Sequence, residues 1–265
     1  VRASEIRLLG RRALPTPVPA SFDDLLSGRR HYQRVEVAGV VRAVSLATNR
    51  TTLRLALGAR KLDVQVLEPP PAELPPLVDA RVRITGLAAG YINDKRQLVA
   101  PQLVLPALAD VQVETAAPAD PFAVPARAVA ELLNFDPAGI SSHRVKVRGV
   151  VTHQQRGTAL FLRDGDRGVL AQTPQPESVQ PGDMVEVAGF PAMGTFSALL
   201  EDAVFRRAGR EADPRPVVTN VREALRGTND ADLVSLEAQL LEVLHTPLES
   251  VLVLRAEGET IAAHG

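Results

Sequence analysis

The side chains that could perform chemistry in this sequence are few and scattered. Cysteine is absent from the 265 residues, which excludes thiolate nucleophiles and thiolate zinc sites. The histidines lack the spacing of roughly three to five residues that metal-binding pairs use; they are His31, His143, His153, His245 and His264. The sequence also lacks a phosphate-binding loop, a nucleophile elbow and a His-Glu-x-x-His run. We therefore predict no catalytic residue, no metal site and no cofactor, with the histidines in solvated loops.

One polar cluster in the second half of the chain is a candidate for ligand binding. It combines residues 153–156, which follow a predicted strand, with residues 163–166 of a predicted hairpin; the loop 190–194 is a further candidate. The binding candidates are His153, Gln155, Arg163, Asp164, Phe190 and Met193. The alternative interpretation is an ordinary solvated hairpin tip, because charged residues at a turn are most often only solvated.

The elements that would position this cluster repeat along the chain. The pattern in residues 34–41 recurs in residues 144–151 and, more weakly, in residues 234–240. Each copy alternates apolar and other residues with period two, which is typical of a half-buried strand. A small residue lies at one fixed position in all three, and as Gly39 and Gly149 it predicts a bulge or sharp bend.

The first two copies continue with the same further elements. Each has a hairpin, turning at Gly58-Ala59 or at Asp164-Gly165, then a proline-containing loop and two more strands. The two further strands are expected at residues 81–86 and 98–105, and at residues 184–189 and 198–206. We therefore predict an all-β fold with short helices, formed by tandem OB-like five-stranded Greek-key barrels. A short helix precedes each barrel, at residues 21–26, 127–133 and 220–225.

A longer match fixes the frame of the repeat. Seven positions within residues 10–41 match positions within residues 209–240 at a constant offset of 199, without a gap. The expected organisation is residues 1–15 as the terminal strand of an upstream truncated module, 16–113 as OB-like module one, 114–121 as a linker, 122–212 as OB-like module two, and 213–265 as the start of a third, truncated module. The chain is expected to be a piece of a longer array.

Composition limits the classes of partner. The net charge is −1 and aromatic residues make up 3% of the chain, so the basic field and the stacking platforms of nucleic-acid binding are missing. We expect no nucleic-acid partner. No stretch approaches the ~20 apolar residues of a membrane span.

Several segments carry a resemblance to a known family. Residues 120–125, 143–152 and 183–194 resemble the extracytoplasmic input region of acidobacterial-type membrane-bound sensor histidine kinases and related diguanylate cyclases. Residues 79–86 and 93–98 are similar to the other module type of that family. The resemblance covers essentially the whole chain, but its motifs define modules and carry no ligand-binding residues. It implies a periplasmic location, with a signal peptide upstream and a transmembrane helix and a kinase downstream.

The functional expectation follows from these points together. The chain is expected to be a non-catalytic sensory or interaction region of a two-component receptor, which relays binding of a small ligand or an envelope protein to a downstream kinase. A membrane-anchored parent could form a homodimer. The alternatives are a nucleic-acid-binding tandem OB protein, a purely structural module array, and a hydrolase with catalytic residues in loops.

Overall fold

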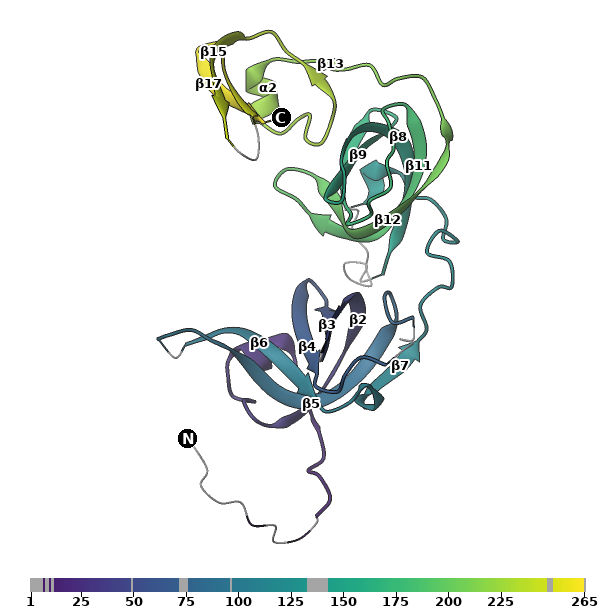
Figure 1. The fold of residues 1–265 in the computed structure, drawn as a ribbon, viewed down its shortest axis with the longest axis vertical. Helices are drawn as coiled ribbons and strands as arrows, with labels where there is room; N and C mark the ends of the chain where they lie inside the picture. Colours follow the sequence, from purple (N-terminus) through teal and green to yellow (C-terminus); the bar gives the residue numbers. More distant parts are fainter. Residues whose placement is uncertain are drawn as a thin grey trace. The chain divides into compact units, whose positions relative to one another are not determined.

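The structure, a computed structural model, describes residues 7, 10, 12–48, 50–71, 76–95, 97–132, 143–246 and 250–264. The chain divides into two compact units, Val1–Ala117 and Pro118–Gly265 (Figure 1). The expected terminal strand in residues 1–15 lies largely outside the described residues.

The first unit is a closed five-stranded barrel with short additions, called barrel one. Its elements are β1 (Val18–Pro19), α1 (Phe22–Leu26), β2 (Arg34–Ala47), β3 (Arg50–Leu57), β4 (Arg60–Val66), β5 (Arg81–Ile92), β6 (Leu98–Leu105), the 3-10 helix η1 (Leu108–Asp110) and β7 (Val111–Thr115). The strands follow the order β2-β3-β4-β6-β5, and pairing of β2 with β5 closes the ring. The β4–β6 pair is parallel. β1 and β7 extend the sheet at its edges.

The second unit contains barrel two and a C-terminal segment. Its elements are the 3-10 helix η2 (Val129–Glu131), β8 (Val145–Gln155), β9 (Ala159–Asp164), β10 (Arg167–Gln172), β11 (Asp183–Met193), β12 (Ala198–Arg210), β13 (Val217–Val218), α2 (Val221–Leu225), β14 (Val234–Ser235), β15 (Gln239–His245), β16 (Ser250–Ala256) and β17 (Glu259–His264). Strands β8 to β12 form a closed barrel in which the β10–β12 pair is parallel. The predicted all-β OB-like fold is confirmed.

The strand glycines mark close approach of the backbone rather than the bulge itself. A Cβ on Gly149 would lie 2.7 Å from the carbonyl oxygen of Arg163, so only glycine fits there. The bulges lie a few residues later, where the pairing shifts between Val41 and Ala43 in β2 and between Val151 and His153 in β8. Both barrels therefore bend their first strand at the same register position.

The short helices begin and end largely where the sequence predicts. Ser21 and Asn220 are the N-caps of α1 and α2, and Ser21 forms a capping box with Asp24. The expected helix at residues 127–133 is different: its described part contains only the single 3-10 turn η2. The end of that prediction lies outside the described residues.

Alternation along the strands produces the two cores. Side chains that point inward are buried. In β10, for example, residues 169 and 171 are buried and residue 170 between them is only partly buried. Among the largest fully buried side chains in barrel one are Leu53, Leu55, Leu62, Ile84, Leu103 and Leu105, and in barrel two they are Leu160, Leu162, Phe190 and Leu200. These buried apolar side chains stabilise each barrel.

The C-terminal segment repeats the start of barrel one. Val18 pairs with Val35 in β1–β2, and Val217 pairs with Val234 in β13–β14, both in parallel. The expected continuous strand over residues 234–240 is interrupted, because β14 ends at Ser235 and β15 begins at Gln239. Strands β15, β16 and β17 form a three-stranded antiparallel sheet. Five of its large apolar residues are exposed: Leu240, Leu241, Val243, Leu244 and Leu252.

Candidate ligand-binding groove of barrel two

Two adjoining hollows lie on the outer face of barrel two, over β9, β10 and β12. Each has a volume of about 560 Å³, and they share Phe161, Leu170 and Gln172 in their walls. We call them together the outer-face groove. It runs from the β8–β9 turn to the β11–β12 loop, which are the loops and strand face that OB-folds use for ligands.

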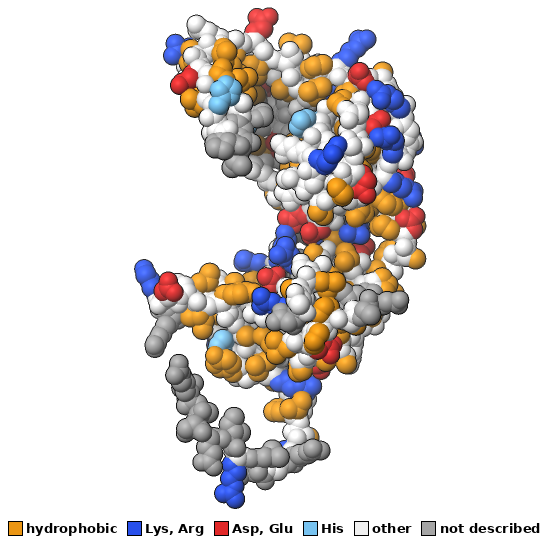
Figure 2. Space-filling model, in the orientation of Figure 1, with side chains coloured by type: hydrophobic (Ala, Val, Ile, Leu, Met, Phe, Trp, Pro, Cys, Tyr) orange, Lys and Arg blue, Asp and Glu red, His pale blue; other side chains and the backbone are white. Residues whose placement is uncertain are grey.

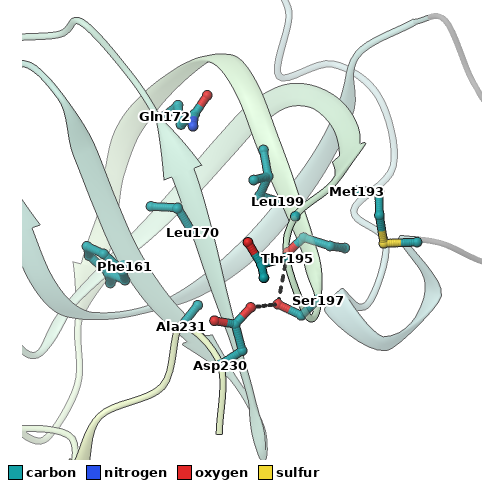
Figure 3. Close-up of a pocket in the computed structure, with 11 residues that line it drawn as sticks. Phe161, Leu170, Gln172, Met193, Thr195, Ser197, Leu199, Asp230 and Ala231 are labelled. Atoms are coloured by element: carbon teal, nitrogen blue, oxygen red, sulfur yellow. Dashed lines mark hydrogen bonds between the residues drawn. The ribbon is translucent and has the colours of Figure 1, made fainter. Parts of the chain in front are cut away.

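Three apolar side chains form the floor of the groove. Phe161 on β9 pairs directly with Leu170 on β10, and Leu170 pairs with Leu199 on β12. These residues alternate with core positions, so their side chains point outward and stay partly exposed. Figure 3 shows Phe161, Leu170 and Leu199 around the hollow. The floor is thus a continuous apolar strip on three strands.

Polar side chains line the rest of the groove. They comprise two amides, four hydroxyls and two carboxylates: Gln155, Gln172, Thr158, Thr173, Thr195, Ser197, Asp202 and Asp230. Ser197 Oγ donates to Asp230 Oδ2 at 2.7 Å, as Figure 3 shows. None of the described lining residues is a lysine, arginine or histidine. The groove therefore presents donors and acceptors without positive charge.

One wall of the groove comes from a turn far along the sequence. Asp230 and Ala231 belong to residues 229–233, called the docking turn, which precedes β14. A Cβ on Gly168 would lie 2.5 Å from the carbonyl oxygen of Ala231, so the turn packs directly on β10 where only glycine leaves room. The groove is complete only when the docking turn lies on barrel two.

A nearly buried ion pair holds the docking turn in place. Arg163 on β9 donates to Asp232 Oδ1 from both Nε, at 2.7 Å, and Nη2, at 2.5 Å. The side chains are only 15% and 5% exposed. Arg163 also donates to the carbonyl oxygens of Arg215 and Leu233, at 2.7 and 3.0 Å. Hydrogen bonds between ionised groups are stronger than those between neutral groups, and both side chains of this pair are almost fully shielded from water.

Barrel one has a different surface at the same positions. The strand register places Arg54 on β3, Asp63 on β4 and Gln102 on β6 where barrel two has its apolar floor. Arg54 Nε and Asp63 Oδ1 form an ion pair at 3.4 Å, and Gln102 Nε2 donates to Tyr91 at 3.1 Å. The polar groups of this face pair with one another, whereas barrel two leaves an apolar strip.

The structure brings three of the six predicted binding residues to the groove. Gln155 lines it at the β8–β9 turn, and Met193, 71% exposed, lines it at the β11–β12 loop. His153 is exposed beside the floor, with its ring centroid 5.8 Å from that of Phe161. These three positions remain candidates for ligand contact.

The other three predicted binding residues lie outside the groove. Phe190 is fully buried, with the Arg144 guanidinium 5.2 Å from its ring centroid. Arg163 is occupied by the docking turn. Asp164 accepts a hydrogen bond from the backbone N–H of Val129 at 3.0 Å and so fixes η2. The charged residues of the hairpin tip therefore have a structural role, because they bind parts of the chain that are distant in sequence.

Sequence reasoning missed the apolar floor. Phe161, Leu170 and Leu199 read as ordinary members of alternating strands. The available signal was the repeat itself: aligned hairpins place Arg54 opposite Asp63 in one copy and Phe161 opposite Leu170 in the other. Where one copy of a repeat has a charged pair on its outer face and the other copy has an apolar pair, the two outer faces are expected to have different roles.

In the part of the chain that the structure describes, no group of three or more histidine, aspartate or glutamate side chains could hold a metal ion. No helix among those residues has the length and apolarity needed to cross a bilayer.

Comparison with known proteins shows only distant likenesses. No family model and no curated protein matches this chain. Among solved structures, the aspartyl tRNA synthetase from Entamoeba histolytica is 13% identical with a TM-score of 0.30, over 46% of this chain and 30% of the synthetase. The p204 HINb domain is 10% identical with a TM-score of 0.26, over 68% and 99%. A murine DNA binding protein bound with ds DNA is 11% identical with a TM-score of 0.27, over 69% and 99%. The TM-scores are too low to carry an argument about function.

Proposed function

We propose that this chain is a non-catalytic recognition region of a signalling receptor, located outside the cytoplasm, and that it binds its ligand in the outer-face groove of barrel two. The observation that carries the proposal is the contrast between the barrels. Barrel one shows that the fold is built with a self-paired polar face at Arg54 and Asp63, so the apolar strip at Phe161 and Leu170 is not a requirement of folding.

The lining of the groove supports binding rather than catalysis. Acyl transfer needs a nucleophile together with a general base that is itself oriented by a third group. Ser197 donates to Asp230, and no imidazole, amine or thiol is among the described lining residues. An arrangement of amides, hydroxyls and apolar side chains in a concave surface is typical of a ligand site.

Charge supports an uncharged or cationic ligand over a nucleic acid. Binding of a polyanion draws its affinity from lysine and arginine at the phosphates, and the described groove residues include only the carboxylates Asp202 and Asp230 as charged groups. Figure 2 shows basic and acidic side chains interspersed on the visible surface. A DNA backbone would therefore be repelled at the groove.

The docking turn provides a route from binding to signalling. A ligand that contacts Asp230 or Ala231 as well as β9 and β10 binds best when the turn lies on barrel two. Binding and docking are then linked, and each favours the other by the same free energy. In a longer receptor, the module after the turn would pass this change toward a kinase.

The test is a screen of uncharged fragments against the 15N-labelled 265-residue chain, read by amide chemical shifts. Fragments are expected to shift the amides of Gln155, Leu170 and Leu199, and Leu170→Asp should abolish those shifts. The matched control is Gln102→Leu in barrel one, which should leave them unchanged. Fragments that bind only elsewhere, or that bind Leu170→Asp equally well, would overturn the proposal.

A further inference from the structure

We infer that the ligand of the outer-face groove is an uncharged saccharide chain that stacks on Phe161. The inference rests on the proposed function and names the chemical class that the groove accepts. It follows from three features of barrel two: the donor and acceptor set, the absence of cations among the described lining residues, and the closure of the barrel.

The polar groups of the groove match a ligand that is rich in hydroxyls. Each hydroxyl of a sugar both donates and accepts, so its partners must offer both functions. Amides and hydroxyls do so, and they line both ends of the groove, as Gln155 and Thr158 at one end and Thr195 and Ser197 at the other. The carboxylates of Asp202 and Asp230 can accept from hydroxyls without needing a charged partner on the ligand.

The apolar floor matches the other character of a sugar ring. One face of a pyranose carries only C–H groups, and these pack favourably on the electron-rich face of an aromatic ring. Phe161 is the aromatic residue of the floor, flanked by Leu170 and by His153. Two adjoining hollows of about 560 Å³ each provide room for more than one ring. A chain of sugars therefore fits better than a single one.

The closed barrel disfavours an extended peptide. A peptide strand gains most of its affinity by adding main-chain hydrogen bonds to an open sheet edge. In barrel two the parallel pairing of Leu170 with Leu199 and of Ala171 with Leu200 closes the ring, so β10 and β12 satisfy each other. The groove lies across paired strands. A peptide there would leave its own backbone groups without partners.

The experiment titrates the 265-residue chain with four uncharged tetrasaccharides: cellotetraose, chitotetraose, xylotetraose and maltotetraose. An uncharged capped tetrapeptide of alanine and threonine and a ten-residue oligodeoxythymidylate are titrated in parallel. We expect saturable amide shifts at Gln155, Leu170 and Leu199 with at least one saccharide. Phe161→Ala should weaken that affinity about tenfold, equivalent to about 1.4 kcal/mol. Arg54→Ala, at the matching position of barrel one, should have no effect.

Each other outcome is decisive. If no tetrasaccharide saturates the shifts up to about 10 mM, a very weak affinity, the saccharide inference is wrong. If the peptide or the oligonucleotide binds and Phe161→Ala removes that binding, the saccharide class is wrong while the groove remains the binding site. If the fragment screen finds no ligand in the groove, the proposed function itself fails.

Discussion

Phe161 on β9 and Leu170 on β10 lie directly opposite each other on the outer face of barrel two. The register of barrel one places Arg54 opposite Asp63 at the same point of its hairpin, as an ion pair. Apolar cross-strand pairs stabilise a sheet, but a strip of them on an outer face also attracts other molecules. Since the sibling barrel closes without such a strip, selection for binding explains it better than selection for stability.

Grafting the pair of barrel one onto barrel two tests this view. The double variant Phe161→Arg, Leu170→Asp should fold, because barrel one closes with the same charged pair at the matching positions. Ligand binding in the groove should fall at least about tenfold. Thermal unfolding and amide-shift titration measure the two effects. The reverse graft, Arg54→Phe with Asp63→Leu, is the control and should leave binding unchanged; a double variant that binds like the parent chain would contradict the assignment.

The ion pair between Arg163 and Asp232 predicts a local opening. Removing one partner of a buried pair costs about 3–5 kcal/mol when the other stays buried, but Arg163 returns to water if the docking turn leaves. Asp232→Asn should therefore detach the turn while barrel two stays folded. Hydrogen exchange should become fast at Leu233, whose N–H donates to Asp232 at 2.8 Å, and at Val217, which donates to Leu233. Asp213→Asn, at a side chain 77% exposed, is the control.

A second variant tests the contact between the docking turn and barrel two by a change on the barrel, at Gly168 of β10. A Cβ at Gly168 would lie within 2.8 Å of three backbone atoms of Ala231 and Asp232, so Gly168→Ala should also detach the turn. Lys61 holds the same hairpin position in barrel one, so a side chain there is compatible with the barrel itself. Protection of the β9–β10 amides should persist. If both variants exchanged at Leu233 like the parent chain, the ion pair would not be what holds the turn.

The barrel architecture was predictable because its information is local and repeated. Alternation of apolar residues marks the strands, and the hairpin turns and strand glycines recur in both copies. The bulge position was missed by a few residues, because Gly149 fixes the approach of the Arg163 carbonyl while the extra residue lies after Val151. The local pattern of apolar residues determines which face of a strand is buried, but it determines the exact register of the strand less strictly.

The contact that Arg163 makes could not be predicted, for a different reason. Its partner Asp232 lies 69 residues later, and no local pattern predicts such a contact. Phe190 was expected in a loop, but β11 extends through Met193 and carries that side chain to a fully buried position. The groove depends on three strands and a distant turn, so only the folded chain brings it together.

The positions of Phe190 and Met193 on β11 predict unequal effects on stability. Phe190→Ala removes a fully buried ring and should lower the free energy of unfolding by about 3–5 kcal/mol. Met193→Ala removes a side chain that is 71% exposed and should change it by less than about 0.5 kcal/mol. Urea denaturation of the chain measures both. Equal effects of the two substitutions would contradict the placement of β11.

A charge pattern shared by the barrels leads to a prediction about pH. In barrel one Glu36 lies 2.7 Å from Arg83, and in barrel two the matching positions carry Lys146 and Glu186, at 3.3 Å with the charges exchanged. Arg206 adds a second cation, with Nη2 at 2.7 Å from Glu186. The hydrogen bond from Arg206, followed by that from Lys146, lowers the pKa of Glu186 below its ordinary value of 4.5.

A lowered pKa in the folded state means that the charged form of Glu186 stabilises barrel two. This contribution is fully present above pH 4.5 and is lost as the pH falls through the folded-state pKa. Glu186→Gln should therefore lower the free energy of unfolding at pH 7 by up to about 1 kcal/mol, and the difference from the parent chain should shrink below pH 4.5. Urea denaturation at pH 7, 5 and 3.5 measures it, with the exposed Glu177→Gln as the control. A difference that stayed constant down to pH 3.5 would show that packing of the side chain, rather than its charge, connects β8, β11 and β12.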